Sequence, residues 1–147
     1  DLHLSLRRQR QMCIRDRLYE EKMNYIFNKI TDLPEKIQNE FLVDALFYRI
    51  HTSIEAVMDI IAMLCKDFGL IVEDDYSNIS YLERQNIISE DLAEELKRLN
   101  SLRNVITHRY KRLDVARIVN SVPEIKRILL EFVEVTEDLL RKIFEGD

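Results

Sequence analysis

The sequence predicts an all-α protein, built as an antiparallel four-helix bundle with one or two short extra helices. Its 147 residues include only two glycines and two prolines, a composition that favours helices over strands. Apolar residues recur at three- and four-residue spacing through four long segments that are joined by short connections. Segments of this kind pack as antiparallel neighbours around one core.

The first two helices are expected at residues 18–31 and 34–68. Asp32 can cap the second helix, Pro34 suits its first turn, and Gly69 suits its end. The apolar positions of the first helix are Leu18, Tyr19, Met23, Ile26, Phe27 and Ile30.

A loop at residues 70–77 is expected to lead into a short helix at 78–85. Ser89 is a candidate N-cap for the third long helix, which should run to near His108.

Two more helices are expected after His108. Asp114 is a candidate cap for a short helix. Ser121 and Glu124 form a Ser-x-x-Glu capping box for the last long helix, which should end near Phe144.

Residues 7–17 are interpreted as foreign to the protein. Their sequence, RRQRQMCIRDR, matches the translation of a transposon-end adapter used in preparing sequencing libraries. The five arginines would also suit a basic arm that binds nucleic acid, but an assembly artefact has to be excluded from arguments about the fold. We therefore expect residues 1–17 to be a non-native artefact outside the fold. Residues 18–147 are expected to form a single domain that is truncated at its N-terminus.

The composition of the remaining chain excludes several classes of protein. Without residues 1–17 the net charge changes from −5 to −8, with 17 basic and 25 acidic residues. Cys65 is then the one cysteine, so no internal disulfide is expected, which fits the cytoplasm. No run of about 20 apolar residues occurs, so we expect no membrane span. Nucleotide hydrolysis is not expected either, because the sequence holds no glycine-rich phosphate loop.

Positive charge is concentrated between Lys97 and Arg117. Asp114 is the one acidic residue in this segment, which leaves a local excess of six positive charges around His108. The basic residues are Lys97, Arg98, Arg103, Arg109, Lys111, Arg112 and Arg117. Such a patch attracts polyanions, although cations at a solvated helix end also interact favourably with the helix dipole.

The residue types inside this patch suit metal-independent RNA cleavage. That reaction has to remove a proton from the 2′-hydroxyl, donate one to the leaving 5′-oxygen and stabilise the phosphate between them. His108 can serve as acid or base near neutral pH, and Arg103 can hold phosphate oxygens with its planar fork of donors. Asn104 can add a neutral donor or fix the other two side chains.

Helix geometry limits how these side chains act together. On one helix Asn104 and His108 share a face, whereas Arg103 and His108 point about 140° apart. Arg103 must therefore curl around the helix, or a second copy must help. In a symmetric homodimer, two such helices would form a composite cleft.

The motif Arg103-Asn104-x-x-x-His108-x-Tyr110 resembles the signature of HepT-like toxins, which belong to the HEPN superfamily. Outside the motif, the similarity is carried by residues 45–60, 88–102 and 110–114. In all it covers about residues 18–144.

The resemblance implies a HEPN-like fold and a metal-independent ribonuclease that acts as the toxin of a toxin–antitoxin pair. His108 would be the acid/base, Arg103 the phosphate-binding group and Asn104 a polar support. The partner would be a small nucleotidyltransferase antitoxin called MntA, which would silence the toxin by transferring AMP to Tyr110. The resemblance also implies a homodimer formed through the motif region. We expect no cofactor and no metal.

Other polar residues have simpler interpretations. His51 is read as an ordinary surface or core histidine, because no metal ligand lies at a suitable spacing. Glu55 and Asp59 share one helix face, where they could pair with the motif arginines or, as we favour, simply face solvent. The basic residues expected to bind the RNA are Arg109, Lys111, Arg112, Lys97 and Arg98.

A second class of function stays open. The chain could be a non-catalytic helical module that docks a nucleotidyltransferase or binds a nucleotide, because a fold alone does not specify an activity. The intact pair of Arg103 and His108 favours the enzyme. A buried His108 that no phosphate could reach would favour the module. The third hypothesis is a generic four-helix interaction domain.

Overall fold

The computed structural model describes residues 2–33, 39–107 and 112–144 of the chain. These ranges contain six helices and no strand. The helices are α1 (Leu2–Thr31), α2 (Glu40–Asp67), α3 (Asp75–Arg84), α4 (Glu90–Thr107), α5 (Arg112–Asn120) and α6 (Val122–Phe144). The all-α fold class predicted from the sequence is therefore confirmed.

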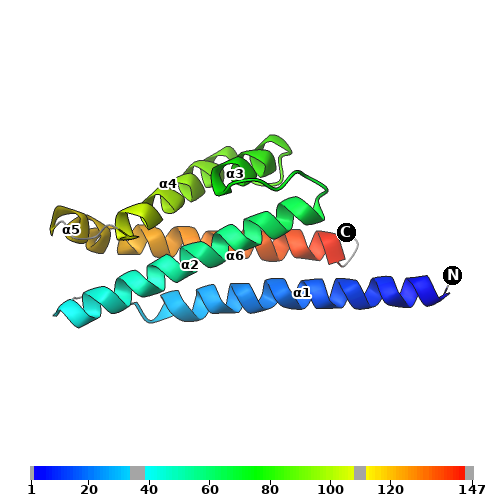
Figure 1. Cartoon of the computed structure of the whole chain (residues 1–147), viewed down its shortest axis with the longest axis horizontal. Coiled ribbons are helices and arrows are strands. Elements are labelled where there is room, and N and C mark those ends of the chain that lie inside the picture. The colour runs from blue at the N-terminus through cyan, green and yellow to red at the C-terminus, as the bar shows by residue number, and fades with distance from the viewer. Residues whose placement is uncertain (1, 34–38, 108–111, 145–147) are drawn as a thin grey trace.

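Helices α1, α2, α4 and α6 form the bundle, and successive members run in opposite directions (Figure 1). Helix α2 is central to this arrangement, because it contacts α1, α4 and α6 as well as α3. Helix α5 packs on α6 at the end of the bundle where α4 ends (Figure 1). None of the described helices combines the length and apolarity needed to cross a membrane.

Helix α1 begins at Leu2 and is continuous through the segment expected to be foreign. Its first turns extend past the end of α6 (Figure 1). Among the described side chains of α1, those that are buried lie at or after Tyr19. The Tyr19 hydroxyl donates to the carboxylate of Asp67 on α2, which also accepts from Arg15 Nε at 3.1 Å. This cluster ties α1 to the last turn of α2.

Most of the predicted inner face of α1 is confirmed. Tyr19, Met23, Ile26 and Ile30 are buried, whereas Leu18 and Phe27 are exposed. The four buried positions follow a strict four-three-four spacing. Leu18 and Phe27 each lie one position outside this spacing, and so the helix turns them toward solvent.

Helix α2 begins later than the sequence suggested. Its N-cap is Asn39, whose Oδ1 accepts from the backbone N–H of Leu42 at 2.9 Å. The predicted cap, Asp32, instead follows the end of α1, and the predicted start at Pro34 lies outside the described residues. Asp32 and Asn39 are both residue types that favour an N-cap, so the sequence alone did not distinguish between them.

The end of α2 agrees with the prediction. Gly69 adopts a left-handed φ of 73°, a conformation that side chains disfavour. The next N–H, of Leu70, donates to the carbonyl of Cys65 at 2.8 Å, which closes the helix.

Helix α3 starts three residues before the predicted Asn78, because Asp74 is its N-cap and Asp75 its first residue. The predicted loop is correspondingly shorter. Ser89 caps α4 as expected, since its hydroxyl accepts from the N–H of Leu92 at 3.1 Å.

The predicted cap of α5 is wrong, and the capping box predicted for α6 does not form. Asp114 lies inside α5 and does not precede it. The Ser121 hydroxyl donates to the carbonyl of Arg117 at 2.7 Å, which serves the end of α5. Glu124 accepts from Arg127 at 2.8 Å, so no reciprocal capping box forms, although α6 still begins where expected.

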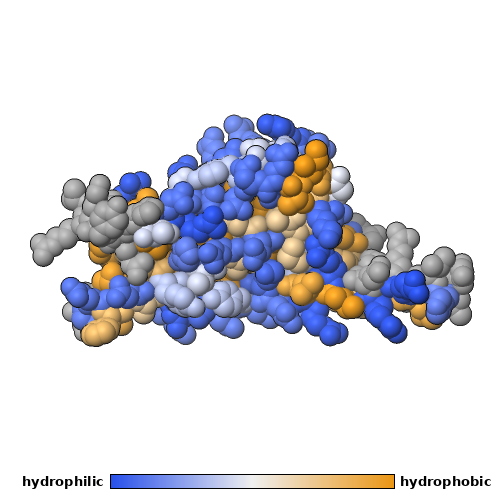
Figure 2. Space-filling view, in the orientation of Figure 1, coloured by the Kyte–Doolittle hydropathy of each residue, from blue (hydrophilic) through white to orange (hydrophobic). Residues whose placement is uncertain are grey.

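The core fills the space between the four long helices, with contributions from α3 and α5. Its largest fully buried side chains include Tyr19, Phe47 and Phe132, and burial of each apolar side chain contributes about 1.5–3 kcal/mol. The visible face in Figure 2 is mostly hydrophilic, with hydrophobic side chains in separate areas. The most exposed large hydrophobic side chain among those described is Phe41, at 86%.

Replacing Phe132 with alanine should therefore lower the free energy of unfolding by about 3–5 kcal/mol, because a cavity remains in the core. The matched control is Phe41→Ala, which should change the same quantity by no more than about 0.5 kcal/mol. Chemical denaturation followed by circular dichroism measures both. Equal losses for the two variants would contradict this description of the core.

Candidate functional site

The buried face of α4 carries a charged residue in an apolar stripe. Leu92, Leu96, Leu99 and Ile106 are buried and follow helical spacing along the side of α4 that faces the bundle. Arg103 occupies the place in this stripe between Leu99 and Ile106, and its side chain is only 26% exposed. A cation at such a position loses much of its hydration, so it needs a compensating partner.

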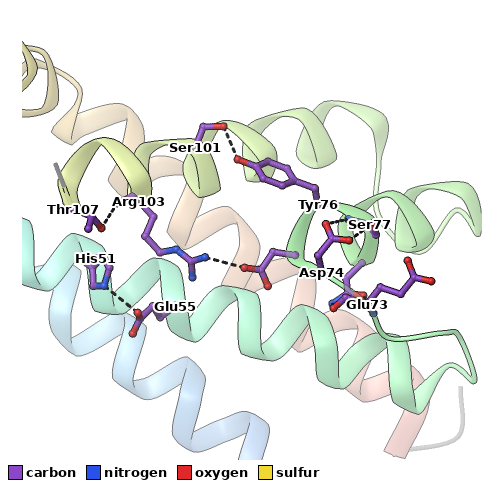
Figure 3. A network of polar contacts seen from close by, with 11 residues as sticks. His51, Glu55, Glu73, Asp74, Tyr76, Ser77, Ser101, Arg103 and Thr107 are labelled. Carbon is purple, nitrogen blue, oxygen red and sulfur yellow. Dashed lines mark hydrogen bonds and ion pairs between the residues drawn. The ribbon is translucent and has the colours of Figure 1, made fainter.

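That partner is Asp75, the first residue of α3. Arg103 Nη2 donates to Asp75 Oδ2 at 3.0 Å, across 28 positions of sequence. Figure 3 shows Arg103 reaching from α4 toward the start of α3. The Asp75 side chain is itself only 31% exposed, so water screens this pair less than it screens a fully exposed one.

A second contact joins α3 to α4 beside this ion pair. Tyr76 and Ser101 share a hydrogen bond of 2.8 Å between their hydroxyl oxygens. The Ser101 hydroxyl also lies 3.1 Å from the carbonyl of Lys97, to which it donates. Two successive residues of α3 therefore hold the last two turns of α4 (Figure 3).

The start of α3 is fixed by its own hydrogen bonds. Asn78 is buried and binds both backbone groups of Glu73, accepting from its N–H at 2.7 Å and donating to its carbonyl at 3.2 Å. The Asp74 carboxylate accepts from the hydroxyl and the N–H of Ser77 at 2.6 and 3.2 Å. The hydrogen bond from the Ser77 hydroxyl, and after it the one from the Ser77 N–H, lower the pKa of Asp74, so this capping carboxylate stays ionised.

Helix α2 carries a histidine and a carboxylate that lie one helical turn apart and contact each other (Figure 3). His51 Nε2 lies 3.0 Å from Glu55 Oε1, and the His51 side chain is 30% exposed. The reading of His51 as an ordinary, partly buried histidine fits this position. The described residues contain no group of three or more metal-binding side chains that could hold an ion.

Of the two interpretations of Glu55 and Asp59, the structure supports the favoured one. Both side chains are more than half exposed, and Asp59 accepts from Lys22 of α1 at 3.1 Å. The acid that pairs with Arg103 is instead Asp75, which the sequence analysis missed. No local signal could have identified Asp75, because the pairing depends on how α3 packs on α4.

The predicted basic residues are distributed unevenly. Arg98 is exposed and lies close enough to α6 to contribute, after Arg127, to the lowered pKa of Glu124. Lys97 is half-buried, and Asn104 is exposed on α4. The remaining predicted RNA-binding residue within a described helix is Arg112, the first residue of α5.

Several predicted site residues lie outside the described residues. They are His108, Arg109, Tyr110 and Lys111. The described helix α4 ends at Thr107, and α5 begins at Arg112, so these residues connect the two helices. The described half of the site therefore consists of Arg103 with its partner, together with Asn104 on the exposed side of α4.

Nearer the start of α4, Arg127 of α6 links the two helices. Its guanidinium donates to Glu95 of α4 at 3.2 Å, and to Glu124 and Glu131 of α6 at 2.8 and 3.0 Å. Hydrogen bonds to Glu124 first, and then to Glu95, raise the pKa of Arg127. Helix α4 is thus fixed by polar contacts from α6 in its first half and from α3 in its last two turns.

Comparison with known proteins gives a consistent family assignment. The family model described as "Ribonuclease HepT-like" matches residues 16–136. Two proteins of Archaeoglobus fulgidus, each named "Putative RNase", are 48% and 38% identical over 125 and 130 residues. The first match covers 85% of this chain and 95% of the relative, and the second covers 86% and 98%.

Solved structures show the same fold at lower identity. One is a tri-AMPylated HEPN toxin of Shewanella oneidensis in complex with an MNT antitoxin, with a TM-score of 0.67 and 20% identity. The match covers 86% of this chain and 96% of that toxin. Another, a mutant MntA toxin–antitoxin complex, has a TM-score of 0.68 and 20% identity over 86% of this chain and 97% of its own.

The HEPN fold is therefore shared with these toxins, and the sequence matches are far more specific. The family model spans most of the chain, and the stronger relative matches it at 48% identity over nearly its full length. The chain belongs to the HepT-like ribonuclease family.

Proposed function

We propose that this protein is a metal-independent endoribonuclease and the toxin of a toxin–antitoxin system. The observation that carries the proposal is Arg103, a cation kept in the apolar stripe of α4 and held there by Asp75. An apolar residue would continue the stripe at lower cost, so the arginine has to be explained by what it binds. Membership of a ribonuclease family supplies the class of ligand, an RNA phosphate.

In this proposal each residue of the motif has one role. Arg103 binds the scissile phosphate and stabilises the charge that develops on it. His108 transfers the proton of the 2′-hydroxyl or of the leaving oxygen, and Asn104 supports the bound phosphate. The flanking cations bind the RNA backbone; they are Lys97, Arg98, Arg109, Lys111 and Arg112.

The site is proposed to be completed in a homodimer. Arg103 lies on the face of α4 that packs on the bundle. On an ideal helix, the side chain of His108 points about 140° away from that of Arg103. One copy therefore does not easily bring both groups to one phosphate. Two copies related by a twofold axis would place the Arg103 of one beside the His108 of the other.

Regulation is proposed to act through Tyr110. The structurally similar Shewanella oneidensis toxin is tri-AMPylated and bound to its antitoxin. By analogy, a nucleotidyltransferase of the MntA type would transfer AMP from ATP to the Tyr110 hydroxyl, with release of pyrophosphate. The added phosphate and adenosine would place negative charge and bulk beside His108, and so would exclude RNA.

The central prediction concerns His108. The purified full chain should cleave RNA in the presence of a metal chelator, and His108→Ala should lower the rate by roughly 10²–10⁴-fold through loss of proton transfer. A fluorescent RNA oligonucleotide measures cleavage, and tightly controlled expression in bacteria should give growth arrest only with the wild type. Equal behaviour of wild type and His108→Ala would leave the non-catalytic module as the better reading.

The composite site predicts complementation between inactive variants. Arg103→Ala and His108→Ala should each be inactive alone, whereas the isolated mixed dimer should recover roughly half of the wild-type rate, because one of its two sites is intact. Co-expression with two different affinity tags isolates the mixed dimer. No recovery in a verified mixed dimer would exclude a site shared in this way.

The tyrosine switch predicts a specific modification. Co-expression with an MntA-type nucleotidyltransferase should add AMP to Tyr110 and abolish RNA cleavage, while Tyr110→Phe should stay active and unmodified. The control is Tyr48→Phe, since Tyr48 is 60% exposed on α2 and should be irrelevant. Peptide mass spectrometry locates the modification, and AMP found only at other residues would contradict the assignment.

A further inference from the structure

We propose that Asp75 is a positioning residue that sets the orientation of the Arg103 guanidinium for phosphate binding. This inference rests on the proposed function, since it concerns how the phosphate-binding arginine is held. It adds α3 to the site, a helix that lies outside the Arg103–Tyr110 motif.

The contact leaves most of the arginine available. A guanidinium carries five N–H donors in a rigid plane. Among the described residues, the side chain of Arg103 binds only Asp75, through Nη2 at 3.0 Å. One fixed donor is enough to orient the plane, and the remaining donors can meet phosphate oxygens in the paired geometry that arginine favours.

Asp75 is well placed for this role because its own position is fixed. It opens α3 directly after the cap Asp74, and Asn78, only 1% exposed, holds the loop before it through two bonds to Glu73. Tyr76 adds a separate link to α4 through Ser101. A carboxylate whose backbone is fixed both before it, by Asn78, and after it, by Tyr76, restricts the arginine more than an exposed side chain would.

Stability alone does not account for this pair. A fully exposed ion pair contributes only about 0–1 kcal/mol, and for a more buried pair the cost of desolvation offsets the attraction, so an apolar pair of similar size is often as stable or more so. The cost of placing a cation in the apolar stripe of α4 is therefore not returned as folding free energy. The pair has a function if it orients the guanidinium before RNA binds. The conformational entropy of the Arg103 side chain is then lost when the protein folds and not during catalysis.

The test compares Asp75→Asn with a matched control. Asp75→Asn keeps the shape of the side chain but removes its charge, and it should lower kcat/KM for RNA by between about ten- and a hundredfold, mostly through kcat. Asp75→Glu should retain more activity than Asp75→Asn. The control is Asp59→Asn, which removes an ion pair of similar length, 3.1 Å to Lys22, away from α4 and should leave kcat/KM unchanged.

A double substitution tests whether Asp75 acts through Arg103. In an Arg103→Lys background, Asp75→Asn should cause no further loss, because the planar fork that it orients is already absent. Circular dichroism at the assay temperature establishes that each variant is folded before its rate is compared.

The outcomes separate this inference from the proposed function. If wild type shows no His108-dependent cleavage, the proposed function fails, and this inference fails with it. If wild type cleaves RNA and folded Asp75→Asn matches it, only the inference is overturned. The inference is also overturned if Asp75→Asn lowers kcat/KM as much in the Arg103→Lys background as in the wild type, or if Asp59→Asn lowers it as much as Asp75→Asn does. Asp75 would then act on overall stability.

Discussion

The need to bury α2 on most of its circumference determines where the other helices lie. Its buried side chains extend from Leu46 to Cys65 and leave only one narrow face to solvent. Helices α1, α3, α4 and α6 all contact it, so each is placed by the apolar surface that α2 presents. The candidate site depends on this arrangement, because α3 and α4 contact each other and both also pack on α2.

Periodicity and single caps predicted much of the fold. The stripes of α1, α4 and α6, the stop at Gly69 and the cap at Ser89 were all local patterns, and local patterns survive folding when the packing agrees with them. The errors occurred where several caps competed. Asn39, and not Asp32, caps α2. The Ser121 hydroxyl binds the end of α5 and does not cap α6. Such choices depend on neighbours that a sequence window does not contain.

The candidate site likewise contains residues that the sequence could predict and one that it could not. Arg103 could be predicted because its motif is local, and its charge stood out in the sequence. Asp75 could not be predicted, because it is 28 residues away and becomes relevant only when α3 packs on α4. The basic patch was predicted from the charges of its own segment alone, yet Arg98 lies near Glu124 of α6, so an acid from another helix offsets part of its field.

The contact between Tyr19 and Asp67 has a consequence for alkaline solution. Burial first, and then the hydrogen bond to Asp67, raise the pKa of Tyr19. The unfolded chain releases this proton near pH 10, whereas the folded chain retains it to higher pH. The stabilisation is therefore complete below pH 10 and is lost progressively above it, as the unfolded state alone gains from ionisation. Strong base should accordingly weaken the attachment of α1, the longest helix of the bundle, to α2.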